Sequence, residues 1–514
     1  MSPVATMDPG RRALVTMCCM TATIMQALDT TIANVALPYM QGSLSASLDQ
    51  INWVLTSYIV AAAIMTAPIG WMADRFGRKI LFVSCVAGFT AASVLCAMAQ
   101  NIEQMVLFRL LQGVAGAALV PLSQSVMLDA YPPERRGGAM AIWGMGVMLG
   151  PIMGPTLGGW LTDNYSWHWV FLINLPIGIG TVIGMLLFLD ETPRQHHLRF
   201  DAFGFAALAV GIGALQLMLD RGERVGWFDS WEIWIEAIIA AAGFYYFFAH
   251  SLTTKEPFVR FELFKDRNFV SSCIFMVVIG VVLFGTMALL TPFMQNVLGY
   301  PILTAGMLLG SRGVGTMLTM MMAPQLMKRF EASYLILTGL ILAAGTLYEM
   351  TGFTLDTPQH TIVTISVIQG VGLGLLFVPI SSVAFATLPN HLRTSGAAMT
   401  TLIRNIGSSI GISMVIANLT SKTSVMHARL TEDVTPFNQA LQFPDVSSVL
   451  NMATDTGRAM LDAIVTQQAA VIAYANVFKL LMVLTIIAMP FVFIIGKTRA
   501  VLNGGNQQAH AALD

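Results

Sequence analysis

Charged residues are scarce in this chain of 514 residues, which holds 27 Lys and Arg and 28 Asp and Glu. They make up 11% of the sequence, whereas a soluble domain carries about 25%. The net charge of -1 leaves no broad positive field for nucleic acid. Because hydrophobic residues reach 55%, the apolar surface exceeds what a water-soluble globule of this size can bury. The composition therefore predicts a polytopic membrane protein.

Cysteine is also rare, and the spacing of the five residues fits neither a disulfide framework nor a metal site. We therefore interpret them as packing thiols and expect neither a metal nor a cofactor. A phosphate-binding loop is absent, because IIGKT at 494–498 lacks the glycine five residues before Gly496 that such a loop needs. No nucleophile and base lie at one predicted membrane depth, so we do not expect an enzyme. An ion gradient must then drive any transport.

Long apolar runs are what the sequence has in abundance. A helix needs about 20 mostly apolar residues to cross the hydrocarbon layer. Fourteen such runs predict an all-α polytopic membrane protein, with spans near 13–37, 52–72, 80–99, 102–127, 138–160, 169–189, 202–219, 231–250, 269–291, 303–325, 333–351, 361–387, 396–418 and 471–496. Most basic residues fall in alternate connecting segments, which marks those segments and both termini as cytoplasmic.

An internal repeat relates residues 112–140 to residues 369–399. Both begin with Gln-Gly-Val, carry Val-Pro in mid-helix, and pass through a proline-containing loop with arginine into Gly-Ala. The second copy comes eight spans after the first rather than six, which predicts two helices inserted between parallel six-helix halves. Such halves, with a substrate site between them, are a secondary-transporter architecture.

The repeat divides the chain into predicted parts. These are a cytoplasmic N-terminus (1–12), a six-helix bundle (13–190), two inserted helices with flanking loops (191–267), a second six-helix bundle (268–497) with a long periplasmic loop (419–470), and a cytoplasmic tail (498–514).

Several short motifs accompany this pattern. They are LDTTIANVALP at 28–38, GWMADRFGRK at 70–79, RLLQG at 109–113, GVMLGPIMGPTLGGW at 146–160 and RNIGSSIG at 404–411. Together they resemble the major facilitator superfamily, and within it the fourteen-span drug:proton antiporters of the EmrB/QacA type. The resemblance covers nearly the whole chain.

The resemblance implies a major facilitator fold and a proton-coupled antiporter in a bacterial inner membrane. Its substrates would be protons and hydrophobic or amphiphilic toxic compounds. It also implies two partners, a periplasmic adaptor of the EmrA type and an outer-membrane channel of the TolC type. An exporter of an endogenous metabolite or a fatty acid on the same fold is an alternative that the residues leave open.

Asp29 is the first candidate for carrying the coupled proton, because an acidic side chain inside a membrane helix is costly. At 1.5 Å per residue, Asp29 lies about 12 Å below the outer end of its predicted helix, and Arg109 lies about 10 Å below the outer end of span 4. A carboxyl that alternates between a dry cavity and water can load and release a proton. A permanently paired Asp-Arg brace is the alternative.

Two further sets of residues are candidates for conformational control. The predicted cytoplasmic gate consists of Gly70, Asp74, Arg75, Gly77, Arg78 and Asp129. A charge pair between Arg78 and Asp129 would hold the gate shut and break when the halves rock. The alternatives are a solvated turn for the motif 70–79 and a simple helix-end charge for Asp129. The predicted helix-packing motif is Gly146, Gly150, Pro151, Gly154, Pro155 and Gly158. Small residues allow close helix contact, and the resemblance implies that this stripe closes a leak between the halves.

Six further polar residues inside predicted spans are candidates for a substrate cavity. They are Asn34, Gln112, Arg312, Gln369, Arg404 and Asn405. Arg312 lies ten residues into its predicted helix and is expected to face a cavity rather than lipid. The abundant methionines could line an adaptable pocket or simply fill space against lipid.

Overall fold

The computed structural model describes residues 8–132, 135–195, 197, 199–254, 257–435, 437–443 and 450–495. Helices make up most of these ranges, which contain no strand. The predicted tail 498–514 lies outside the described residues, as do the first seven residues of the predicted N-terminus 1–12.

The helices of the first half are α1 (Pro9–Ser43), α2 (Leu48–Thr66), α3 (Ile69–Phe76), α4 (Arg78–Ala97), α5 (Ile102–Gly116), α6 (Leu119–Ala130), α7 (Arg136–Asn164), α8 (Trp169–Leu172) and α9 (Asn174–Phe188). Two helices follow, α10 (Ala202–Val225) and α11 (Trp231–Thr253). The second half holds α12 (Arg267–Pro292), α13 (Ile302–Arg329), α14 (Ala332–Met350), α15 (Gln359–Ala386), α16 (Arg393–Glu432), α17 (Gln439–Gln442) and α19 (Asp455–Ala488).

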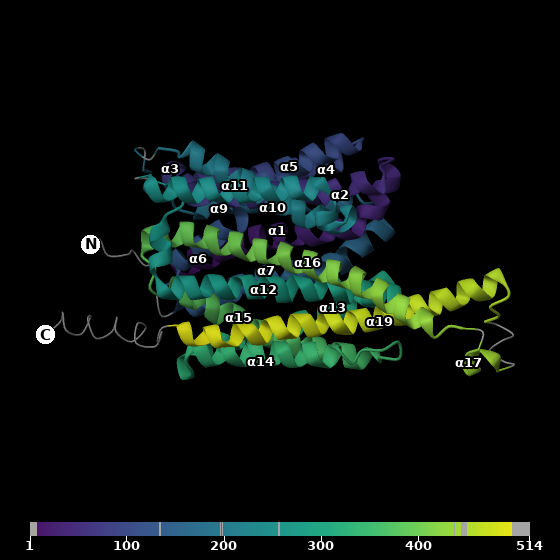
Figure 1. The fold of residues 1–514 in the computed structure, drawn as a ribbon. Helices are drawn as coiled ribbons and strands as arrows, with labels where there is room; N and C mark the ends of the chain where they lie inside the picture. The colour runs from purple at the N-terminus through teal and green to yellow at the C-terminus, as the bar shows by residue number, and fades with distance from the viewer. Residues whose placement is uncertain are drawn as a thin grey trace.

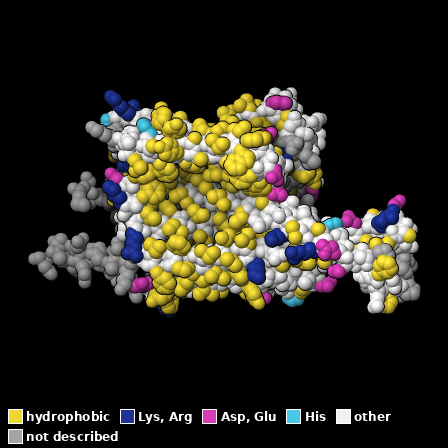
Figure 2. All heavy atoms as spheres, viewed as in Figure 1, with side chains coloured by type: hydrophobic (Ala, Val, Ile, Leu, Met, Phe, Trp, Pro, Cys, Tyr) yellow, Lys and Arg dark blue, Asp and Glu magenta, His cyan; other side chains and the backbone are white. Residues whose placement is uncertain are grey.

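The described part of the chain has twelve helices long and apolar enough to cross a membrane, or thirteen when the bent pair α2 and α3 counts as one span. Their apolar side chains form a broad band across the molecule, and charged side chains gather at its two ends (Figure 2). The helix α13 is not among the twelve, although its 28 residues would extend about 42 Å. It carries Arg312 and packs between α7 and α15.

The predicted span 52–72 is bent where α2 meets α3, by 58°. Pro68 follows the end of α2 and has no backbone N–H to donate to the carbonyl of Ile64, so the helix cannot continue regularly there. The predicted span 102–127 also divides, into α5 and α6, but stays straight enough to count as one span.

Each half of the chain forms its own helix bundle. In the first half α1 packs against α6, α7 and α9; in the second half α12 packs against α15, α16 and α19. The two bundles meet mainly where α7 packs against α13. The pair α10 and α11 is joined to both bundles, because α10 contacts α2 and α16. Figure 1 shows these helices running roughly parallel across the molecule.

The segment 419–470, expected to be a long loop, is mostly helical. The helix α16 continues to Glu432 and α19 begins at Asp455, so residues 433–454 alone connect them. Both helix ends project beyond the rest of the bundle (Figure 1), and the His427 ring bonds Asp462 at 3.0 Å across the pair. The expectation was wrong because it ended each helix where the apolar run ended. Polar residues end a membrane span but need not end a helix, because most of them have helix propensities close to those of apolar residues.

Both ends of the described chain lie at the same end of the bundle. Arg11 of α1 forms an ion pair with Asp190 at 2.5 Å, and Arg267 at the start of α12 donates to the carbonyl of Ile494 at 2.7 Å. We call this the Asp129 end, because Asp129 also lies there.

Candidate functional site

The glycine stripe of α7 fixes the position of α1 on both sides of Asp29. A Cβ atom on Gly150 would lie 2.2 Å from the backbone of Ala27, and one on Gly154 would lie 2.1 Å from the hydroxyl of Thr31. The Thr31 hydroxyl also donates to the carbonyl of Gly150 at 2.9 Å. Only glycine permits this approach, so the packing motif holds the backbone that carries Asp29.

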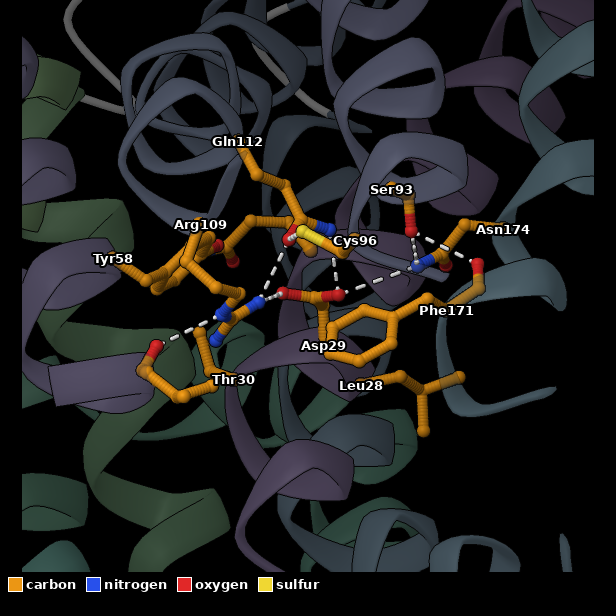
Figure 3. Close-up of polar contacts among 12 residues, drawn as sticks. Leu28, Asp29, Thr30, Tyr58, Ser93, Cys96, Arg109, Gln112, Phe171 and Asn174 are labelled. Carbon is orange, nitrogen blue, oxygen red and sulfur yellow. Dashed lines mark hydrogen bonds and ion pairs between the residues drawn. The ribbon is translucent and has the colours of Figure 1, made fainter. Parts of the chain in front are cut away.

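Asp29 lies at the centre of a polar network between four helices, drawn in Figure 3. Arg109 of α5 donates to its Oδ2 at 2.6 Å. Gln112 of the same helix donates to its Oδ1 at 2.8 Å, and Asn174 of α9 donates to that oxygen at 3.3 Å. Asn174 in turn donates to Ser93 of α4 at 3.0 Å. Both carboxylate oxygens therefore have partners.

The guanidinium of Arg109, like the carboxylate of Asp29, makes several polar contacts. Its Nε donates to the carbonyl of Val54 at 3.0 Å, and its Nη1 donates to Gln112 as well as to Asp29. The ring of Tyr58 lies 4.3 Å from the guanidinium carbon and that of Phe171 lies 5.6 Å from it. Aromatic faces at these distances attract the cation. Tyr58 and Arg109 are each only 1% exposed.

Asp29 and Arg109 compensate each other's charge inside the bundle. Asp29 is 1% exposed, and both of its carboxylate oxygens accept hydrogen bonds. Removing one partner of such a buried pair leaves an uncompensated charge, which is strongly destabilising.

A second charge cluster joins the two halves at the Asp129 end. Asp129 of α6 pairs with Arg78 of α4, and its other oxygen accepts from Arg393 of α16 at 2.6 Å. Beside it the hydroxyls of Ser125 and Thr394 bond at 2.8 Å. The Arg393 side chain is 5% exposed. The first half therefore supplies an acid, and the second half supplies a buried arginine to it.

The motif 70–79 makes a second contact across this end. Asp74 pairs with Arg260 at 2.7 Å, and its carbonyl accepts from the backbone N–H of Gln195 at 2.8 Å. Gly70 approaches α16 so closely that a Cβ would lie 2.3 Å from the hydroxyl of Ser395. One guanidinium nitrogen of Arg75 is buried without a partner. Together with the Asp129 cluster, these contacts join the first half to α16 and to the segment before α12 at this end.

Gly77 is required for the turn between α3 and α4. Its φ of +90° is strained for any residue with a Cβ, and a Cβ there would lie 2.4 Å from the carboxylate of Glu191. Glu191 accepts from the backbone N–H groups of Lys79 and Ile80 at 3.0 and 3.3 Å. A carboxylate at the start of a helix is favourable, so Glu191 anchors the motif.

The structure does not gather the candidate cavity residues into one pocket. Gln112 belongs to the Asp29 network, and Asn34 lies exposed on α1. Arg312 lines a small cavity between α7, α12 and α13. Gln369 of α15 is buried, and neither polar atom of its amide has a partner. Arg404 is 8% exposed and lies on α16 next to Asn405.

Sequence reasoning did not identify several residues of these clusters. Asn174, Ser93 and Tyr58 are ordinary polar residues in apolar runs, and no local pattern marks them. Arg393 did carry a signal, because it is the loop arginine of the second repeat copy and corresponds in place to the arginines that follow Asp129 in the first copy.

Comparisons with known proteins identify the family. The pattern of the Major Facilitator Superfamily matches residues 19–412. The multidrug export protein EmrB of Escherichia coli (strain K12) is 35% identical over 446 residues, covering 85% of this chain and 86% of that protein. The fatty acid resistance protein FarB of Neisseria gonorrhoeae is 33% identical, covering 92% and 94%.

A solved structure is similar in fold alone. The crystal structure of a bacterial homolog of the human lysosomal transporter Spinster has a TM-score of 0.55 and 19% sequence identity. The match covers 96% of this chain and 98% of that chain.

Proposed function

Because the chain belongs to the Major Facilitator Superfamily and, within it, to the EmrB-like proteins, we propose that it is a proton-coupled antiporter. It exports hydrophobic or amphiphilic toxic compounds across a bacterial inner membrane, with both termini in the cytoplasm. The name of the Escherichia coli relative, a multidrug export protein, supports export as the activity. The bias of basic residues toward alternate segments supports the orientation.

The observation that carries proton coupling is the buried pair of Asp29 and Arg109. A carboxyl group inside a bundle is expensive to maintain unless its charge has a use. When the outer side opens, water reaches Asp29 and protonation releases Arg109 from it. When the inner side opens, Asp29 loses the proton and recovers Arg109. Export of one substrate and import of one kind of ion are thereby tied to the same rocking movement.

The Asp129 cluster serves as the inner gate in this cycle. Asp129 reaches the second half through Arg393 of α16, and beside it Asp74 pairs with Arg260 of the segment before α12. These contacts must break before the inner side can open. The gate therefore favours the conformation in which the cytoplasmic side is closed.

A transport assay with purified protein tests proton coupling directly. Proteoliposomes with an imposed pH gradient should accumulate a fluorescent cationic amphiphile such as ethidium, while a trapped pH dye reports protons moving the opposite way. The membrane potential is clamped with valinomycin and potassium, so that the pH gradient is the single driving force. Accumulation that is independent of the pH gradient would contradict the proposal.

The projecting ends of α16 and α19 are the proposed contact for a periplasmic adaptor of the EmrA type, which leads to an outer-membrane channel of the TolC type. In the segment 433–454 that connects these ends, the hydrophobic side chains of Phe437 and Phe443 are 87% and 63% exposed. Exposed apolar groups among charges are typical of a surface that a partner covers.

Removing 428–461 tests this contact without disturbing the bundle. The Nε2 atom of His427 lies 3.0 Å from Oδ1 of Asp462, so the two helices are neighbours at this level and a short Gly-Ser linker can join them. The shortened protein should still transport ethidium in proteoliposomes, but cells should lose resistance and the crosslink to a co-expressed adaptor. Full resistance with an unchanged crosslink would exclude this region as the docking surface.

Export of a fatty acid is the second candidate function, favoured by the relative named as a fatty acid resistance protein, at 33% identity. A susceptibility panel in a pump-deficient host separates the two. Broad resistance to dyes and cationic detergents favours multidrug export, whereas resistance confined to fatty acids favours the second function.

A further inference from the structure

Arg312 is the most isolated charge among the described residues of the bundle. It is 5% exposed, and none of its three guanidinium nitrogens has a hydrogen-bond partner. It lies ten residues after the start of α13, about 15 Å along the helix. A charged group held inside a protein without a partner is strongly unfavourable. This cost demands an explanation.

The surroundings of Arg312 form a small apolar cavity between the two halves. Its walls include Met148 and Ile152 of α7, Leu283 and Met287 of α12, and Leu309 of α13. The volume is about 20 Å³, enough for about one water molecule. In this conformation the cavity holds no larger ligand.

The cavity lies at the seam that must open during transport. A Cβ on Gly313 would lie 2.2 Å from the side chain of Ile152, and one on Gly306 would lie 2.8 Å from the hydroxyl of Thr156. These contacts join α13 to α7, the helix with the glycine stripe. When the halves separate, the cavity widens on the side of Arg312.

A second group without a partner lies on the neighbouring helix. The backbone of α15 touches α13 at the level of Arg312, since a Cβ on Gly370 would lie 2.0 Å from the Arg312 carbonyl oxygen. Gln369, the adjoining residue, has both amide atoms buried without a partner. A guanidinium and an amide can both donate to one carboxylate.

We propose that Arg312 binds the anionic head group of a single-tailed amphiphile, whose tail lies against the methionine and aliphatic walls. The inference rests on the proposed function, because it names a class of amphiphilic substrate for the same exporter. The charge of the ligand replaces the partner that the protein does not supply. Methionine suits the tail because its flexible side chain adapts to irregular shapes.

Ligand binding to the full chain in lipid nanodiscs tests the proposal at pH 8. The probes are dodecanoate, its neutral analogue dodecanamide, and acetate as the head group alone. Dodecanoate should bind the parent protein at least tenfold more tightly than Arg312→Gln, equivalent to about 1.4 kcal/mol. Dodecanamide should bind both proteins equally, and acetate should bind neither measurably.

Two further variants separate a binding role from a structural one. Arg312→Lys keeps a charge without the planar fork and should recover part of the dodecanoate affinity. Lys479→Gln removes a cation from the outer groove between α16 and α19 and should not change the dodecanoate affinity.

Thermal unfolding gives a second measurement. The parent should unfold at a higher temperature with dodecanoate than without it, and Arg312→Gln should lose this shift while still binding dodecanamide. That last result shows that the variant is folded.

Equal dodecanoate affinity in the parent and Arg312→Gln would overturn the proposal. Measurable acetate binding by the parent that is lost in Arg312→Gln would also overturn it, because the site would then bind small anions rather than an amphiphile. The proposed function is judged separately by ethidium transport. Retained proton-driven ethidium export in a protein that does not bind dodecanoate through Arg312 would remove this inference and leave the antiporter intact. Absence of any proton-driven export by the parent would instead remove the proposed function.

Discussion

Two buried arginines, one in each half, have opposite surroundings. Arg109 donates to Asp29, Gln112 and the carbonyl of Val54 and lies near two aromatic rings. Arg312 is buried to a similar degree and meets no acceptor among the described residues. The first half therefore provides a carboxylate that neutralises its buried arginine, whereas the described residues of the second half provide no carboxylate for Arg312. This difference is the basis of our proposals that the first half couples ions and that Arg312 in the second half binds a ligand.

The largest expected effect follows from removing the counter-charge of Arg109. In Asp29→Asn, proton-driven export should fall to background in the proteoliposome assay, because no carboxyl remains to carry the proton. The single variant also leaves Arg109 without its ion partner, so loss of folding must be excluded. In Asp29→Asn/Arg109→Gln the charge is balanced again; this variant should regain thermal stability but not transport. Uphill ethidium transport by either protein would remove Asp29 from the mechanism.

The next largest effect is a difference in folding stability between variants of the two arginines. Arg109→Gln leaves Asp29 as an uncompensated buried charge, and we expect a loss of about 3–5 kcal/mol. Arg312→Gln removes a charge that has no partner, so we expect no loss or a gain in the absence of ligand. Thermal unfolding in nanodiscs measures both, with Lys479→Gln as the control. A comparable loss in Arg312→Gln would mean that Arg312 has a structural partner, and the comparison would fail.

The packing that holds Asp29 in place should respond to a single methyl group. Gly150→Ala places a Cβ 2.2 Å from the backbone of Ala27, which must shift α1 or α7. Overpacking of this kind costs about 1–3 kcal/mol, and it should disturb transport because α1 carries Asp29. Gly138→Ala is the matched control on the same helix, since nothing lies within 4 Å of its added Cβ. Equal activity of both variants would show that the stripe does not position Asp29.

The smallest effect concerns Arg393, an arginine of the second half that, unlike Arg312, forms an ion pair. Asp129→Asn removes the charge that Arg393 and Arg78 share, so the closed inner gate should weaken by about 1.4 kcal/mol, a tenfold shift in the equilibrium. Maleimide labelling of a cysteine introduced on the cytoplasmic side of the cavity should rise without substrate. Ser125→Ala, which removes the neighbouring hydroxyl bond alone, should change labelling less. Unchanged labelling in Asp129→Asn would reduce the cluster to a solvated turn.

The sequence by itself determined the helical membrane character, because a composition so poor in charge leaves the chain no soluble fold. It also marked Asp29, Arg109, Arg78 and Asp129, since charges at such places are costly or recur in motifs. Hydropathy placed the helices but not their ends. The helices α16 and α19 continue far beyond their apolar stretches, because the backbone hydrogen bonds of a helix do not require apolar side chains.

Only the tertiary structure decided which charges meet. Asn174 and Ser93 complete the Asp29 network from helices remote in sequence. Arg260, from the segment before α12, pairs with Asp74, and Arg393 of the second half pairs with Asp129. Local sequence cannot encode such pairings, because they depend on how helices are rotated and packed. The same holds for Arg312, whose isolation is a property of its neighbours. The sequence places a charge in α13, and only the packing of apolar side chains from α7 and α12 around it shows that its guanidinium meets no acceptor among the described residues.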